Sequence, residues 1–147
     1  MFVVDTNILV YAANRDSRDH KLCNEWLATW ARQQPKWHVT WGICYEFMRV
    51  VTHEQVLRSP LSAVEAWDFL EALRDSGGLE VLTPTERHAV VLAQLVQELP
   101  HLSGNIMHDV ETAVLMREHG IRRIYTRDTD FHKFPFIEPV DPLRVST

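Results

Sequence analysis

The sequence contains few of the residues that cross-link or extend a chain. Its 147 residues include two cysteines, Cys23 and Cys44, and neither lies in a Cys-x-x-Cys pair, so a zinc ribbon and a redox motif are excluded. Five glycines, with no repeat or low-complexity stretch, exclude a collagen-like or disordered chain. We therefore expect a fold without cross-links, in which each cysteine is a buried thiol.

Long apolar runs and two common catalytic motifs are also missing. No run approaches the roughly 20 residues needed to cross a bilayer, and the apolar start carries Asp5 and no basic leader. Residues 53–57, His-Glu-Gln-Val-Leu, begin like the zinc motif His-Glu-x-x-His but lack its second histidine, and no phosphate-binding glycine loop occurs. We expect a cytoplasmic protein without a membrane segment, and neither a zinc hydrolase nor a nucleotide-dependent kinase.

Positive charge is in deficit. The chain has 15 basic and 20 acidic residues and a formal net charge of -5, whereas nucleic-acid binding normally uses a basic surface. The remaining composition, with 46% hydrophobic and 24% charged residues, is typical of a globular chain. The length predicts a single domain over residues 1–147.

Strand and helix patterns alternate along the whole chain. Apolar β-rich runs predict strands at 2–4, 38–40, 79–82 and 123–126, with a last candidate at 136–137. Helical spacing, caps and breakers predict helices at 8–13, 19–33 (ended by Pro35), 42–52, 62–74 (with a Ser62/Glu65 capping box), 85–99 and from 105 to Gly120. The alternation predicts an α/β fold, a three-layer α/β/α sandwich on a central parallel sheet of four to five strands.

Several acids follow the predicted strands directly. Asp5 comes after the first strand, and Asp128 and Asp130 come after the strand at 123–126. In an open parallel sheet, binding sites form at the carboxyl ends of the strands. We therefore expect these carboxylates to lie at one edge of the sheet.

Two further acids are predicted on inward-facing sides of helices. At 100° per residue, Glu46 lies within about 60° of Ile43 and Val50, at the edge of the apolar stripe and away from the solvent face. Asp109 lies at a similar angle from Ala113, near the start of a helix whose amino end is expected at the same edge of the sheet. Both carboxylates would then need a partner.

Each acid also has an ordinary structural alternative. Asp5 could cap the helix from residue 8, and Glu46 could pair with Arg49 on a solvated surface. Asp109 could interact with a helix dipole, although Asn105 is better placed as the cap. The two acids after the strand at 123–126 could be simple turn residues.

Considered together, these acids favour a metal site. Four or five clustered carboxylates with no base between them would raise one another's pKa values, and a divalent cation removes that repulsion. Oxygen ligands without histidine or thiolate fit Mg²⁺ or Mn²⁺ better than Zn²⁺. Such a site, with one or two ions, can hydrolyse a phosphodiester.

The stretches that hold these acids resemble a known family. They are residues 4–9 (Val-Asp-Thr-Asn-Ile-Leu), the Glu46-Phe47 pair, the helix with Asp109 and Ala113, and residues 125–131 (Tyr-Thr-Arg-Asp-Thr-Asp-Phe). Together they resemble the PIN-domain ribonucleases, in particular the VapC toxins of bacterial toxin–antitoxin pairs. The acids stand in the family's order from the first stretch to the last.

The resemblance implies a PIN-like fold and a Mg²⁺-dependent endoribonuclease, with Mn²⁺ as a substitute. The implied catalytic and metal-binding acids are Asp5, Glu46, Asp109 and Asp128, with Asp130 as a further ligand, while Asn7 and Thr126 would orient ligands or water. The implied partners are an RNA substrate (tRNA or another structured RNA), a cognate antitoxin protein and a second copy in a homodimer. His108 departs from the family pattern, as a substrate contact or as a capping or packed histidine.

The net negative charge then no longer argues against a nucleic-acid partner, because cations in one pocket would offset several of the acids. Candidate phosphate contacts are Arg15, Arg18 and Lys21 after the first strand, and Arg127 at the edge of the sheet. Two other functions remain open at this point. They are a metal-dependent DNA nuclease or phosphatase, and a PIN-like interaction module without catalysis.

Overall fold

A computed structural model describes residues 1–33 and 36–144 of the chain. Within these residues the strands form one sheet in the order β3-β2-β1-β4-β5, and every neighbouring pair is parallel. The strands are β1 (Phe2–Val4), β2 (Trp37–Thr40), β3 (Leu79–Leu82), β4 (Arg123–Tyr125) and β5 (Glu138–Val140). The predicted parallel sheet is confirmed, with five strands.

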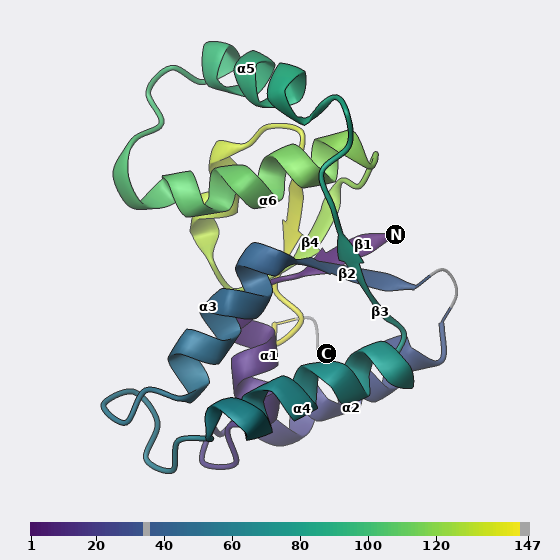
Figure 1. The fold of residues 1–147 in the computed structure, drawn as a ribbon, viewed down its shortest axis with the longest axis vertical. Coiled ribbons are helices and arrows are strands. Elements are labelled where there is room, and N and C mark those ends of the chain that lie inside the picture. Colours follow the sequence, from purple (N-terminus) through teal and green to yellow (C-terminus); the bar gives the residue numbers. More distant parts are fainter. Residues whose placement is uncertain (34–35, 145–147) are drawn as a thin grey trace.

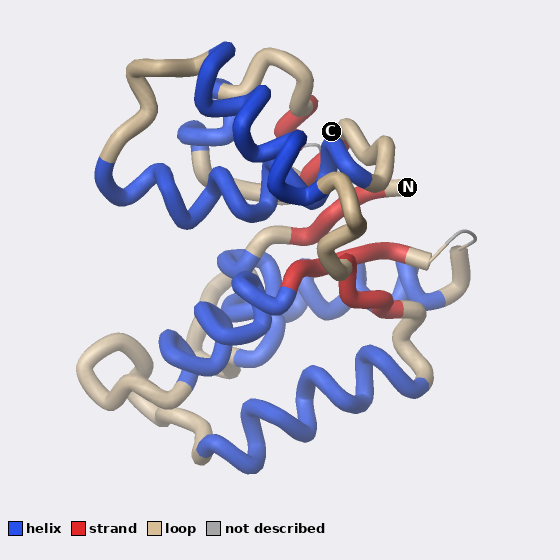
Figure 2. The backbone as a smooth tube through the Cα atoms, turned by 45° about the horizontal axis from the view of Figure 1, so that its top comes forward, coloured by secondary structure: helices blue, strands red, loops and turns tan. Residues whose placement is uncertain are grey.

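Helices cover both sides of this sheet. The described residues form α1 (Thr6–Ala13), α2 (His20–Ala31), α3 (Trp41–Val51), α4 (Ala63–Asp75), α5 (His88–Glu98) and α6 (Met107–Glu118), with short 3-10 helices η1 (Gly104–Ile106) and η2 (Thr129–Lys133). Figure 1 shows α5 and α6 above the strands and α2 and α4 below them. In Figure 2 the strands again lie between the two groups of helices. The predicted three-layer arrangement is therefore confirmed.

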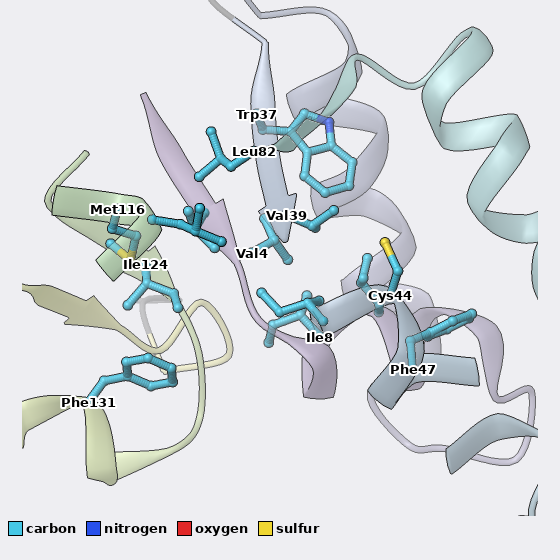
Figure 3. Packing of buried hydrophobic residues seen from close by; sticks show 14 of the residues in the cluster. Val4, Ile8, Trp37, Val39, Cys44, Phe47, Leu82, Met116, Ile124 and Phe131 are labelled. Atoms are coloured by element: carbon cyan, nitrogen blue, oxygen red, sulfur yellow. The ribbon is translucent and has the colours of Figure 1, made fainter. Parts of the chain in front are cut away.

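The core fills the space on either side of the central strands. Val3 and Val4 of β1 are both 0% exposed, as expected for a strand covered on two faces. Trp30 of α2 packs against Phe2 and Tyr125, with ring centroids 5.3 and 4.9 Å away, and so fixes α2 to the sheet. Figure 3 shows other apolar side chains meeting from β1, β2, β4 and the helices.

Both cysteines are buried free thiols, as predicted. Burial raises the pKa of Cys23 to about 12 and that of Cys44 to about 11. Neither thiol is therefore ionised near neutral pH, and both act as apolar core groups.

Two helices begin at residues other than those predicted. α1 begins at Thr6 and not at residue 8, because the Asp5 carboxylate accepts the Thr6 N–H at 2.8 Å and caps the helix. α5 begins at His88 and not at residue 85, because Thr85 donates its N–H and its hydroxyl to Glu118 of α6, at 2.8 and 2.6 Å. These bonds hold the start of the predicted helix in a turn.

The last strand was predicted two residues too early. β5 covers Glu138–Val140, and Ile137 of the expected strand is a buried residue just before it. Pro139 lies inside β5, which is at the edge of the sheet, where a residue without an N–H is tolerated. Because of Pro139, the residue pattern of this segment did not predict β5.

Other predicted boundaries agree more closely. α4 begins with the full capping box between Ser62 and Glu65, and Gly120 has a φ of 69° directly after α6 and its cap residue. The helix predicted over 19–33 covers His20–Ala31, and its predicted breaker, Pro35, lies outside the described residues. No helix in the described ranges has both the length and the apolar character needed to cross a membrane.

The order of the strands determines where the site forms. β1 and β4 are neighbours, and Val4 is paired with Tyr125, so Asp5 and Thr126 leave the sheet side by side at its carboxyl edge. α1 and α3 begin at the same edge, directly after β1 and β2. Because α3 also packs against α6, residues from four parts of the chain meet there.

Candidate active site

A cleft of about 970 Å³ opens at the carboxyl edge of the sheet. Its walls come from the β1–α1 junction, α3, the start of α6 and the segment after β4. The acidic residues that line it are Asp5, Glu46, Asp109, Glu111 and Asp128. All four of the predicted catalytic acids are therefore brought together, from positions spread over most of the chain.

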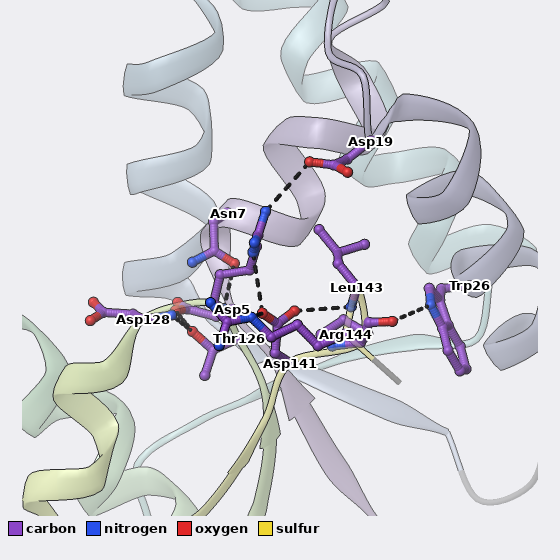
Figure 4. Close-up of polar contacts among 11 residues, drawn as sticks. Asp5, Asn7, Asp19, Trp26, Thr126, Asp128, Asp141, Leu143 and Arg144 are labelled. Atoms are coloured by element: carbon purple, nitrogen blue, oxygen red, sulfur yellow. Dashed lines mark hydrogen bonds and ion pairs between the residues drawn. The ribbon is translucent and has the colours of Figure 1, made fainter. Parts of the chain in front are cut away.

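Asp5 is the most deeply buried of these acids, with only 9% of its surface exposed. One carboxylate oxygen accepts the Thr6 N–H, and the other accepts the hydroxyl of Thr126 at 2.6 Å (Figure 4). Burial raises the pKa of Asp5, its two hydrogen bonds oppose that rise, and the charges of Asp128 and Glu46 add to it. Asp5 is thus both the predicted helix cap and part of the cleft.

Thr126 connects two of the acids. Its hydroxyl donates to Asp5 and accepts the N–H of Asp128 at 2.9 Å, and Asp128 in turn accepts the N–H of Asp130 at 2.8 Å. Asn7, the other residue predicted to orient ligands, lines the cleft and accepts the Arg127 N–H at 3.4 Å. These bonds fix the segment after β4 against the start of α1.

Asp109 lies in the first turn of α6 and faces these carboxylates. Burial raises its pKa to about 7, and the charges of Asp5, Asp128 and Asp130 contribute to the rise. Carboxylate oxygens of Asp109, Asp128 and Asp130 lie within 4.8 Å of one another. An all-oxygen set of mutually repelling carboxylates fits a divalent cation such as Mg²⁺.

Glu46 lines the cleft but differs from its predicted environment. Its side chain is 46% exposed, so the prediction that it lies away from the solvent face is wrong. The alternative is confirmed, because Arg49 donates to both of its carboxylate oxygens, at 3.0 and 2.6 Å. These bonds lower the pKa of Glu46. The angular position of Glu46 on the helix did not account for how far its long side chain extends toward solvent.

Asn105 was also predicted in a different role. It lies in η1, and α6 begins without a side-chain hydrogen bond at its cap, so Asn105 is not the capping residue. The 3-10 helix η1 precedes α6, so α6 begins at Met107, two residues after the predicted start at residue 105. Asn105 lines the cleft instead, next to His108, which is exposed there as its substrate-contact alternative requires.

The basic residues predicted to contact phosphate lie elsewhere. The guanidinium of Arg127 is held by Asp19 at 3.5 Å and by Asp141 at 3.3 Å, and Arg127 is not among the residues that line the cleft. Arg15, Arg18 and Lys21 are exposed but are not among the residues that line the cleft. Arg127 is therefore ion-paired in this structure, and its role as a phosphate contact stays a prediction.

Two cleft residues were missed by sequence reasoning, Glu111 as an additional acid and Arg49 as a cation at the cleft. Glu111 packs so closely on Gly42 that a Cβ there would lie 2.5 Å from its Oε1 atom. That oxygen is the far end of an exposed side chain that can move aside, and no local pattern in the sequence indicated that Glu111 lies at the cleft.

These features define a class of protein, a parallel α/β fold whose carboxylates gather at the carboxyl edge of the sheet to form a divalent-cation type of site. Residues 2–137 match the family model of the PIN domain. The chain belongs to the PIN-domain family.

Individual relatives agree with this assignment. Ribonuclease VapC43 of Mycobacterium tuberculosis is 30% identical over 134 residues, which cover 91% of this chain and 90% of that one. VapBC2 from Rickettsia felis, solved bound to a DNA fragment from its promoter, shares the fold with a TM-score of 0.63 at 17% identity over 95% and 96% of the two chains. M. tuberculosis VapC20, a sarcin-ricin loop cleaving toxin, has a TM-score of 0.62 at 22% identity over 94% and 98%. The resemblance to PIN-domain proteins of the VapC type is confirmed.

Proposed function

We propose that this protein is a divalent-metal-dependent endoribonuclease and the toxin of a toxin–antitoxin pair. The observation that carries the proposal is the cleft, where Asp5, Asp109 and Asp128 face one another and their charges help to raise the pKa of Asp109 to about 7. A cation removes that repulsion. The VapC relative named as a ribonuclease supports RNA as the substrate.

Asp109, Asp128 and Asp130 would hold the cation, because their oxygens already lie within 4.8 Å of one another. Asp5 and Glu46 complete the predicted set from the cleft wall. Their donor chemistry suits Mg²⁺, with Mn²⁺ as a substitute. When bound, the cation would polarise the scissile phosphate and lower the pKa of an attacking water.

The chain's own residues prepare the site for this chemistry. Thr126 orients the Asp5 carboxylate by donating its hydroxyl and fixes the backbone of Asp128 by accepting its N–H, while the Asp128 carboxylate is held by the Asp130 N–H. Asn7 keeps the segment after β4 against α1 through the Arg127 N–H. Asp109, whose pKa is about 7, would have to be ionised to hold a cation, which would couple metal affinity to pH.

The partners follow from the same comparison. VapC20 is named for cleaving the sarcin-ricin loop, which supports tRNA or another structured RNA as the substrate here. The solved VapBC2 assembly supports a cognate antitoxin. An exposed apolar side of α5, with Val90, Leu92 and Val96 at 52%, 37% and 38% exposure, supports a homodimer.

A substrate panel tests the activity. The protein is incubated with a tRNA, a stem-loop RNA, a single-stranded DNA and p-nitrophenyl phosphate, each with Mg²⁺ and with EDTA. We expect internal cleavage of RNA only with Mg²⁺. Cleavage of the DNA or hydrolysis of the small ester in place of RNA would establish the nuclease or phosphatase alternative. No hydrolysis of any substrate by metal-loaded protein would establish an interaction module.

A further inference from the structure

The outer edge of α3 carries an aromatic ring and a cation beside the cleft. Tyr45 is 74% exposed, and the side chain of Arg49 is 61% exposed. Residues four apart on a helix are neighbours on its surface, so the two side chains lie next to each other. Arg49 and the adjacent Glu46 line the cleft. Tyr45 and Arg49 therefore extend the cleft surface outward from the acids.

Charge makes Arg49 distinctive. Among the residues that the structure describes around the cleft, it is the only lysine or arginine, against five acids. A phosphate held by a cation at the acids is compensated, but the next phosphate of an RNA strand would meet uncompensated negative charge. Arg49 is the side chain in this cleft that can neutralise it, through charge-assisted bonds to its oxygens.

The present partner of Arg49 does not prevent this contact. Its bonds to Glu46 join two side chains that are 61% and 46% exposed and three residues apart on one helix. Exposed pairs of this spacing contribute little to stability, since both groups are solvated when apart. If Glu46 held a cation, Arg49 would lose this partner and could turn toward a phosphate at the cleft.

Tyr45 supplies a different kind of contact. A buried tyrosine contributes to packing, but a ring with 74% of its surface exposed contributes little to the core. Aromatic rings beside a phosphate-binding cation form the stacking platforms that hold single-stranded nucleic acids. A ring at this position can stack on the base of the nucleotide whose phosphate Arg49 contacts.

We propose that Tyr45 and Arg49 form a binding site for the nucleotide adjacent to the cleaved bond, with Tyr45 stacked on its base and Arg49 on its phosphate. This inference rests on the proposed ribonuclease function and adds specificity residues to it. It selects a strand whose base is unpaired next to the cleaved bond, because a paired base cannot stack on the ring.

Binding without cleavage tests the proposal. The probe is a fluorescein-labelled 12-nucleotide single-stranded RNA with Ca²⁺ in place of Mg²⁺, followed by anisotropy, with a gel to check that the RNA stays intact. We expect Tyr45→Ala to weaken binding about tenfold and Tyr45→Phe to stay within about twofold of wild type, because phenylalanine keeps the stacking face. On an abasic version of the probe, wild type and Tyr45→Ala should bind equally.

Salt dependence tests the arginine. Arg49→Gln should weaken binding severalfold and reduce the slope of log K against log salt by about 0.7, the value for one phosphate contact on a single strand. Arg58→Gln, an exposed arginine that is not part of the cleft lining, is the matched control and should leave the slope unchanged. Val64→Ala is the control for loss of an exposed apolar side chain, at 69% exposure.

Three results would overturn the inference. They are wild-type affinity in Tyr45→Ala, an equal loss on the abasic probe, or a change in sedimentation of Tyr45→Ala with unchanged RNA binding, which would assign this edge to a protein interface. If wild type cleaves RNA with Mg²⁺ and these variants still bind normally, only this inference fails. If wild type cleaves no RNA, the proposed ribonuclease function itself is contradicted, and this inference with it.

Discussion

Two acidic clusters border one short segment after β4. In the first, Asp128 lines the cleft together with Asp5 and Asp109; burial raises the pKa of Asp109 to about 7, and the charges of Asp5 and Asp128 add to the rise. In the second, Asp19 and Asp141 are joined by the guanidinium of Arg127. Similar carboxylates are thus left without an arginine at one cluster and paired with one at the other. The first arrangement suits a cation that arrives from solution, and the second stabilises the fold.

The largest effect is expected from the cluster in the cleft. Asp5→Asn should lower RNA cleavage by at least about 100-fold while circular dichroism and the melting temperature show a folded protein, because the amide oxygen keeps one of the two accepted hydrogen bonds but the side chain carries no charge for a cation. Asp68→Asn, at an exposed position on α4, is the control and should cleave normally. Mg²⁺-dependent cleavage at the wild-type rate by Asp5→Asn would contradict the proposed role of this carboxylate.

The opposite effect is expected from the paired cluster. Arg127→Gln should reduce the free energy of unfolding by about 2 kcal/mol, because it leaves Asp19 without its counter-charge and Asp141 with only the exposed Arg144. Thermal denaturation measures the change. Arg123→Gln, whose pair with Glu138 is long and exposed, should change stability by less than about 0.5 kcal/mol. A normal melting temperature with weakened RNA binding would return Arg127 to the role predicted from the sequence.

The unpaired cluster should also make stability depend on pH. Asp109 has a pKa of about 7 when folded, against 3.8 for the ordinary carboxyl, so the native state binds more protons than the unfolded state between these values. The contribution of Asp109 to stability in EDTA should therefore fall as pH rises from about 4 to 7. Allowing for partial exposure, the change is on the order of 1 kcal/mol.

Asp109→Asn removes this contribution. The variant should be more stable than wild type at pH 7.5 in EDTA and about equally stable at pH 4, where both carry a neutral side chain. Urea unfolding at several pH values measures both curves. A stability difference between variant and wild type that does not grow from pH 4 to pH 7.5, or a variant that is less stable at pH 7.5, would contradict the account.

The smallest effect concerns the exposed pair on α3. Arg49→Gln should change the free energy of unfolding by less than about 0.5 kcal/mol, because the Glu46–Arg49 pair is solvated on both sides. Urea unfolding is sufficient to measure this. A loss comparable to that of Arg127→Gln would show that this pair is structural and would weaken the case for Arg49 as a substrate contact.

Much of the fold followed from local pattern. The strand at 2–4 and the capping box at Ser62 were predictable because a buried apolar run and a cap are local signals. β5 was not, because Pro139 is acceptable only at the edge of a sheet, and strand order is not visible in the sequence.

The site divides in the same way. The candidate acids were found from their positions after strands and along helices; four of them line one cleft, and a carboxylate oxygen of Asp130 lies within 4.8 Å of oxygens of Asp109 and Asp128. The environments of Glu46 and Arg127 were not found, because each depends on which side chains lie nearby in space. The pairing of Arg127 with Asp19 and Asp141 joins parts of the chain that no local pattern relates.

Calorimetric titration with Mn²⁺ tests most directly whether the cleft acids form a cation site. In wild type at pH 6.5 we expect saturable binding with release of protons, seen as a heat that varies with the ionisation enthalpy of the buffer, because Asp109 is partly protonated before the cation binds. Asp109→Asn should bind far more weakly and release no proton from this position. Equal affinity and equal proton release in wild type and variant, or no saturable binding in wild type, would contradict the account.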